Sequence, residues 1–152
     1  FTKFLEEESC GKCVPCREGV RRMKEVLIDI TEGRGTEESI PLIEELAEAI
    51  TWGSLCALGG TAGNPVLSTL RYFRDEYEAH IKEKRCPAGV CKELITYAIL
   101  PDLCTGCHRC FRECPQQAVS GEVKKPHAID PAKCIKCGIC YDVCKFDAVA
   151  KK

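Results

Sequence analysis

The spacing of the cysteines constrains this sequence more than any other feature. Fourteen of the 152 residues are cysteines, several times the usual share in a globular protein. Eight of them form two runs with the same C-x2-C-x2-C-x3-C spacing, at residues 104–114 and 134–144. Each run is followed a few residues later by Ala-Val, which indicates an internal duplication. Whatever these thiols bind must therefore organise the fold around them.

This spacing is typical of iron–sulfur ligation. Two-residue gaps let three thiolates in one short loop reach three corners of a [4Fe-4S] cubane, while the fourth cysteine of the run ligates the other cluster. The pattern predicts one cluster held by Cys104, Cys107, Cys110 and Cys144, and a second held by Cys134, Cys137, Cys140 and Cys114. Zinc is the rival metal, but it needs only one four-ligand set per site and leaves the paired runs unexplained.

A third group of cysteines lies near the start of the sequence. Cys10, Cys13 and Cys16 supply three ligands, and Cys56 in a glycine-rich segment is the nearest candidate for the fourth. These residues predict a third [4Fe-4S] cluster, with a zinc site on the same four residues as the alternative. The glycines of that segment also suggest a phosphate-binding loop, but no Lys-Ser or Lys-Thr follows them.

The hydrophobic pattern predicts helices around the first group of cysteines and short strands around the duplicated runs. Apolar residues recur every three or four positions over 20–30, 43–50 and 66–81. Residues 52–63 are too rich in glycine for a helix, and 119–123 is typical of a tight hairpin turn. The expected fold class is α+β: a small helical bundle domain with one cluster (1–84), a junction (85–100), and a bacterial-type two-cluster ferredoxin domain with a duplicated βαβ-like unit (101–152).

Two cysteines remain, and both lie in the junction. Cys86 and Cys91 follow His80 with the spacing H-x5-C-x4-C, and His127 lies between the two repeats. These four side chains predict a tetrahedral zinc site that clamps or hinges the two domains. Buried thiols without a metal and a cluster shared with another subunit stay open as alternatives. His108, next to Cys107, is expected to lie exposed beside a cluster and to tune it modestly.

Charge and hydropathy exclude several functions. The net charge is -1, so the sequence carries no overall electrostatic footprint for nucleic acid or an anionic membrane. No apolar run approaches the roughly 20 residues of a membrane helix, and no signal peptide begins the sequence. No acid–base pair or activated nucleophile is evident. We expect a cytoplasmic electron-transfer module cut from a longer oxidoreductase chain; the alternative is a metal-stabilised docking module for subunit assembly.

Several motifs resemble a known family. The C-terminal helical domain of the NADH-oxidising flavoprotein subunit of respiratory complex I is similar to residues 8–19 (ESCGKCVPCREG), 54–59 (SLCALG) and 64–69 (NPVLST). The longer flavin subunit of multimeric NAD(P)-linked [FeFe]-hydrogenases, including electron-bifurcating ones, resembles this sequence in its CPAGVC segment and appended two-cluster ferredoxin.

The resemblance has three implications for cofactors and partners. The cluster of Cys10, Cys13, Cys16 and Cys56 accepts electrons from reduced FMN in that family. The domain that binds FMN and NAD(P) precedes this sequence in the longer subunit. The partners are the other subunits of a hydrogenase or dehydrogenase complex, and soluble ferredoxin is a further candidate.

Overall fold

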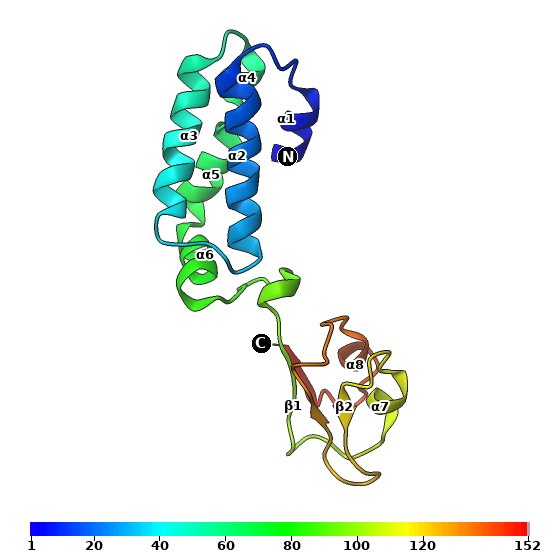
Figure 1. Cartoon of the computed structure of the whole chain (residues 1–152). Helices are drawn as coiled ribbons and strands as arrows, with labels where there is room; N and C mark the ends of the chain where they lie inside the picture. The colour runs from blue at the N-terminus through cyan, green and yellow to red at the C-terminus, as the bar shows by residue number, and fades with distance from the viewer. Residues whose placement is uncertain (152) are drawn as a thin grey trace. The chain divides into compact units, whose positions relative to one another are not determined.

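A computed structural model describes residues 1–151 of the chain. It divides into two compact units, Phe1–Pro87 and Ala88–Lys152, so the boundary falls inside the segment predicted as a junction. The first unit is helical, and the second combines short helices with two small sheets, which makes the chain a mixed α and β protein (Figure 1). Within the described residues, no helix has the length and apolar character needed to cross a membrane.

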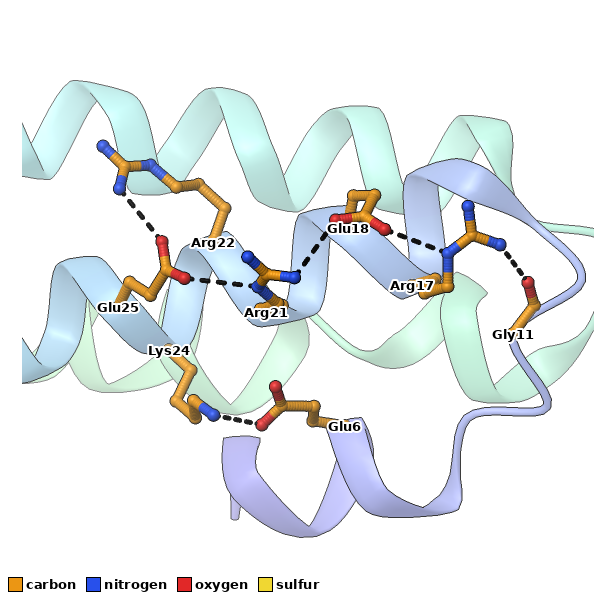
Figure 2. A network of polar contacts seen from close by, with 8 residues as sticks. All are labelled: Glu6, Gly11, Arg17, Glu18, Arg21, Arg22, Lys24 and Glu25. Atoms are coloured by element: carbon orange, nitrogen blue, oxygen red, sulfur yellow. Dashed lines mark hydrogen bonds and ion pairs between the residues drawn. The ribbon is translucent and has the colours of Figure 1, made fainter.

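The first unit is built on two long helices that lie side by side (Figure 1). Its helical elements are, in chain order, α1 (Thr2–Glu8), α2 (Val14–Thr31), α3 (Ser39–Gly53), α4 (Ala57–Thr61), α5 (Asn64–Tyr72), α6 (Arg74–Glu78) and the π-helical turn η1 (Ala79–Glu83). The apolar faces of α2 and α3 supply the largest fully buried side chains, Val20, Met23, Ile43 and Ile50. An ion pair between Lys24 and Glu6 ties α1 to α2 (Figure 2).

The third predicted helix is interrupted. The sequence predicts one continuous helix through Ile81, but α5 ends at Tyr72, and the backbone of the next residue, Phe73, leaves the helical region (φ -133°, ψ 36°). The carbonyl of Phe73 then accepts the backbone N–H groups of Glu76 and Tyr77 and starts α6. Phe73 is 52% exposed, so the apolar stripe does not continue through it. The periodicity identified the buried positions before this residue but could not reveal the break.

The glycine-rich segment 52–63 also differs from expectation, because helix α3 runs on to Gly53 and a further helical turn, α4, follows. The missing side chain of Gly53 lets the end of α3 pack on the start of α2, since a Cβ there would lie 2.5 Å from Cγ of Pro15. Tertiary packing therefore overrides the low helix propensity of glycine here.

The second unit contains two antiparallel strand pairs and two short helices. Its elements are η2 (Lys92–Leu94), β1 (Tyr97–Ile99), α7 (Arg109–Glu113), β2 (Val119–Ser120), β3 (Ala128–Ile129), α8 (Ile139–Asp142) and β4 (Val149–Lys151). Strand β1 pairs with β4, with Ile99 opposite Val149, and β2 pairs with β3, with Val119 opposite Ile129. The connection between β2 and β3 spans 121–127, so the tight turn predicted over 119–123 is wrong.

The two cysteine runs have matching backbone conformations. Left-handed residues occur at three pairs of positions offset by the repeat length: Gly106 and Lys136, His108 and Gly138, and Gln117 and Asp147. Equivalent hydrogen bonds also cross between the halves, because Leu100 N–H donates to the Ala148 carbonyl and Asp130 N–H donates to the Ala118 carbonyl, both at 2.7 Å. The duplication in the sequence is thus matched by the local backbone around the cysteines.

The close approach of α2 and α3 gives a stability prediction. A Cβ at Gly19 would lie 2.5 Å from Cγ1 of Ile50, whereas a Cβ at Gly60, in α4, would meet nothing within 4 Å. Both glycines are helical, so Gly→Ala brings a similar gain in helix propensity at either site. We expect Gly19→Ala to be less stable than Gly60→Ala by about 1–3 kcal/mol, the usual cost of overpacking. Thermal unfolding followed by circular dichroism measures the difference; equal midpoints would contradict the close helix contact.

Candidate metal centres

The four cysteines predicted for the first cluster lie around one cavity of the first unit. The cavity has a volume of about 80 Å³ and is lined by Cys10, Cys13, Cys16, Cys56, Glu8, Ser9, Ser54 and Leu58. Cys10 lies in the loop between α1 and α2, Cys13 and Cys16 lie at the start of α2, and Cys56 directly precedes α4. The turn after α3 therefore brings the distant Cys56 to the other three.

The loop that carries Cys10 is fixed by side chains on both sides. Arg17, in the first turn of α2, donates from Nη1 to the Gly11 carbonyl at 2.5 Å (Figure 2). Gly11 N–H donates to Ser9 Oγ at 3.3 Å, and Ser9 Oγ lies 3.5 Å from Cys16 Sγ. Because the Ser9 oxygen already accepts a hydrogen bond, its own proton can be donated to the sulfur. The loop thus presents a hydroxyl donor to a ligand thiolate.

A second serine indicates that this cavity suits a group with acceptor atoms. Ser54 Oγ is buried and has no hydrogen-bond partner among the described residues. An unsatisfied buried hydroxyl costs about 1–3 kcal/mol, so a cavity-lining hydroxyl without a partner suits a ligand that accepts its proton. Gly59 makes room for this arrangement, since a Cβ there would lie 2.2 Å from Ser54 Oγ and 3.3 Å from the Cβ of Cys16.

The thiol of Cys56 is prepared for ligation. Backbone N–H groups of Gly59 and Leu58 hydrogen-bond to it and hold the pKa of Cys56 below its ordinary value. A thiolate is the form that binds a metal. Four convergent thiolates with hydroxyl donors beside them fit a [4Fe-4S] cluster, whose sulfurs accept hydrogen bonds. The same four thiolates would also satisfy zinc, whereas a cluster would offer Ser54 its sulfide sulfurs as acceptors in addition to the thiolates.

In the second unit, the duplicated cysteines line two separate small cavities. One is lined by Cys104, Cys107, Cys110 and Cys144, with Ile99, Thr105, His108, His127, Phe146, Ala148 and Val149 around them. The other is lined by Cys114, Cys134, Cys137 and Cys140, with Tyr97, Pro115, Gln116, Ala118, Val119, Ile129, Ile135, Gly138 and Ile139 around them. In each cavity, three cysteines of one run meet the fourth cysteine of the other.

Burial and the charges of neighbouring cysteines raise the pKa of two of these thiols and so disfavour their ionisation. Burial, followed by the charge of Cys134, raises the pKa of Cys140 to about 11. Burial and the charges of Cys104 and Cys107 also raise the pKa of Cys110. Four thiolates in one apolar cavity repel one another, so a cationic centre is needed to stabilise them together. Ionisation of all four thiols in either cavity therefore requires a bound cationic centre.

The segment 80–91 gathers a further set of ligand atoms. His80, Cys86 and Cys91 each offer one ligand atom, and these atoms lie within 4.8 Å of one another. His80 Nδ1–H donates to the Glu76 carbonyl at 2.7 Å, which fixes the tautomer whose Nε2 carries the lone pair. His80 and Cys86 are buried.

His127, the predicted fourth ligand, is not part of this set. Its Nδ1 lies 3.1 Å from the Lys125 carbonyl, and its Nε2 lies 2.8 Å from Nδ1 of His108. Both ring nitrogens are thus engaged inside the second unit, and the role of His127 as a zinc ligand stays a prediction. His108 is likewise half-buried and bonded to His127, where the sequence suggested an exposed side chain.

Sequence reasoning missed the serines beside the first cluster site. Ser9 directly precedes Cys10 and Ser54 stands two residues before Cys56, so a hydroxyl flanks the ligand in both loops. That repeated placement was the available signal. The pairing of His108 with His127 had no comparable signal, because it depends on the path of the 121–127 connection.

The cavity around Ser54 gives a prediction for the first site. In Gly59→Ala the new methyl group would occupy the space of Ser54 Oγ and press on Cys16, so we expect this site to lose its metal group. Iron per chain should fall by about four atoms, the content of one cubane, while the spectra of the other clusters persist. Gly60→Ala, one residue away with open space around it, is the matched control. Equal iron contents in the two variants would contradict this account of the cavity.

Comparison with known proteins agrees with the two-part organisation. Residues 1–80 match the family model described as the NADH-ubiquinone oxidoreductase-F iron-sulfur binding region. Residues 96–145 match the model described as a 4Fe-4S dicluster domain.

Among curated relatives, the NADP-reducing hydrogenase subunit HndC of Solidesulfovibrio fructosivorans is 51% identical over the whole chain, which covers 31% of that relative. An NADH-quinone oxidoreductase subunit of Streptomyces coelicolor is 45% identical over 87 residues, 57% of this chain and 19% of the relative. The mitochondrial NADH dehydrogenase [ubiquinone] flavoprotein 1 of Dictyostelium discoideum is 39% identical over 83 residues, 55% of this chain and 17% of the relative.

The chain therefore spans a third or less of the length of these relatives. Its first unit carries the cysteine cavity at the start of α2, and more than half of the sequence matches the corresponding family model. The chain belongs to the family of the NADH-ubiquinone oxidoreductase-F iron-sulfur binding region, and a 4Fe-4S dicluster domain follows that region in it.

Proposed function

We propose that this chain is an electron-transfer module that relays single electrons through three [4Fe-4S] clusters. The relay connects a flavin bound elsewhere in the longer protein with a partner subunit of an NAD(P)-linked hydrogenase or dehydrogenase complex. The observation that carries this proposal is the sorting of twelve cysteines into three sets of four, each around its own cavity. The remaining two cysteines lie in the separate group with His80.

Each set combines covered and exposed ligands, as electron transfer requires. Thiolate-ligated cubanes accept and release one electron at a time, with potentials set by hydrogen bonds to sulfur and by solvent exposure. In the first set Cys16 is buried, whereas Cys10 and Cys56 are exposed. In the second unit Cys107 and Cys137 are exposed, and their companions are half-buried. The chain thus shields each site while leaving one edge close to solvent, where a redox partner can approach.

The proposal includes a duplicated βαβ-like ferredoxin fold for the second unit. The matched left-handed positions and the equivalent hydrogen bonds that cross between the halves support this assignment. Exchange of Cys114 and Cys144 between the two clusters would tie the halves together, since each cluster would be ligated from both.

The relatives of this chain favour the same role. One relative is a subunit of an NADP-reducing hydrogenase, and others are NADH-quinone oxidoreductase subunits. Reduced FMN and a nicotinamide nucleotide would bind in the part of the longer protein that this chain does not cover. Other subunits of the complex are the proposed partners, and soluble ferredoxin is a further candidate for exchanging electrons with the second unit.

A zinc ion is the proposed occupant of the His80, Cys86 and Cys91 group. One imidazole nitrogen and two thiolates are typical zinc ligands, and water or another side chain would complete the tetrahedron. Three cysteine and histidine ligands are too few for a [4Fe-4S] cluster with full protein ligation. The role of this ion would be structural, because it would cross-link residues on either side of the turn at Pro87.

Metal analysis tests the relay directly. We expect the anaerobically purified protein to contain about twelve irons and twelve acid-labile sulfides for this chain, as three cubanes require. Its broad absorption near 400 nm, typical of such clusters, should bleach with dithionite, and new EPR signals should appear. A colourless protein that contains zinc in place of iron would favour a docking module and overturn the relay.

Substitution separates the zinc group from the clusters. We expect Cys86→Ser and Cys91→Ser to lose about one zinc per chain and to keep their iron, because the proposed ligand sets share no residue. The matched control is Glu83→Gln, which changes an exposed carboxylate of the same segment that is paired with Arg85. Inductively coupled plasma mass spectrometry measures both metals; unchanged zinc in the cysteine variants would exclude this site.

A further inference from the structure

Two neighbouring pairs of equivalent positions differ between the two cluster cavities of the second unit. His108 and Gly138 correspond in the repeat, and so do His127 and Tyr97. In one half the two histidine side chains meet, with His108 Nδ1 2.8 Å from His127 Nε2. In the other half a Cβ at Gly138 would lie 3.0 Å from the hydroxyl of Tyr97. The same space is therefore filled by two imidazoles at one cavity and by a tyrosine over a glycine at the other.

The hydrogen bonds around the histidines fix their direction. The Lys125 carbonyl can only accept, so His127 Nδ1, 3.1 Å away, carries the proton and donates. In a neutral ring the other nitrogen, Nε2, must then accept, and His108 Nδ1–H is its donor. The result is a directed chain from His108 through His127 to the backbone at Lys125. His127 is only 4% exposed, so its Nε2 needs this partner.

These hydrogen bonds between the histidines place a backbone N–H group next to a proposed cluster ligand. His127 N–H donates to Cys104 Sγ at 3.5 Å. A further hydrogen bond joins the neighbouring turn to the loop that carries Cys104 and Cys107: Lys124 N–H donates to the Gly106 carbonyl at 2.9 Å. His108 is itself held by stacking on Phe111, with ring centroids 4.2 Å apart. The two imidazoles therefore fix the 124–127 segment, and with it the N–H group that faces the sulfur.

We propose that His108 and His127 are positioning residues that raise the reduction potential of the cluster at Cys104, Cys107, Cys110 and Cys144, without acting on its neighbour. An N–H group donated to a ligand sulfur stabilises the more negative, reduced cluster, so holding that donor in place raises the potential. The inference rests on the proposed function, because it requires a cluster in each cavity.

Isotope labelling identifies the cluster concerned. The chain has three histidines, and of these the amide nitrogen of His127 faces a ligand sulfur in the second unit. In the intact cluster-loaded protein grown with ¹⁵N-histidine, pulsed EPR during a redox titration should show a ¹⁵N coupling on one cluster signal. The coupling should disappear in His127→Tyr grown with the same label, which assigns that signal to the Cys104 cavity.

Repeat-swap variants test the effect on potential. His108→Gly copies Gly138, and glycine tolerates the left-handed backbone at this position (φ 65°). The double variant His108→Gly/His127→Tyr copies the whole arrangement of the other cavity, so a native precedent for its packing exists in the same chain. We expect both variants to shift the midpoint potential of the assigned signal to more negative values and to leave the second signal in place. Tyr97→Phe, at the other cavity, is the control and should leave the assigned signal unmoved.

The possible outcomes separate this inference from the proposed function. A protein without iron would overturn both. A cluster-loaded protein whose assigned signal keeps its potential in the repeat-swap variants would overturn the role of the histidines and leave the relay intact. If the variants lose the cluster, the labelled native protein still decides, since the absence of any ¹⁵N coupling removes the proposed contact.

Discussion

Convergence of thiols from distant segments is the constraint on which the rest of the structure depends, and the second unit shows this most clearly. Its buried hydrophobic side chains are few and mostly small: Leu94, Ile95, Ala118, Val119, Ala148 and Val149. A domain of this size rarely buries enough apolar surface to fold by that means alone. With Cys114 and Cys144 exchanged between cavities, metal bonds would close long loops in both halves. Folding and cluster binding would then be one event.

In the first unit, hydrophobic packing brings the cysteines together. Its helices have a hydrophobic core of their own, centred on residues such as Met23, Ile43 and Ile50, and the cysteine cavity involves the start of α2. The contact of Gly53 with Pro15 sets the end of α3 against that start. Because the chain turns there, Cys56 reaches Cys13 and Cys16 without a long flexible loop. In the first unit, the packed helices bring the cysteines together. In the second unit, metal binding by the cysteines would supply much of the stability of the fold.

Much of this organisation could be predicted from the sequence, because ligand spacing and hydrophobic periodicity are local properties. The apolar positions of α2 and α3 and the grouping of the cysteines follow from such patterns. The break at Phe73 could not be predicted, since the same periodicity runs through a residue that the structure turns toward solvent. The position of the His127 side chain could not be predicted either, because it depends on hydrogen bonds that the connection 121–127 makes after folding. Patterns predicted which residues could be ligands, and tertiary packing decided where the remaining polar groups lie.

Duplication gives the second unit two similar frameworks without making them chemically equal. The positions of the cysteines and the left-handed residues that shape their loops are repeated, because ligand geometry tolerates little change there. The positions between them differ: His108 corresponds to Gly138, and Pro115 corresponds to Lys145. Hydrogen bonds and charge near sulfur set a cluster's potential, so these differences would give the two proposed clusters different potentials without changing their ligands. Two sites with equal potentials would share an electron equally, whereas two unequal sites give it a preferred position. A repeated ligand frame with divergent surroundings is therefore a simple route from one ancestral binding unit to a relay with a direction.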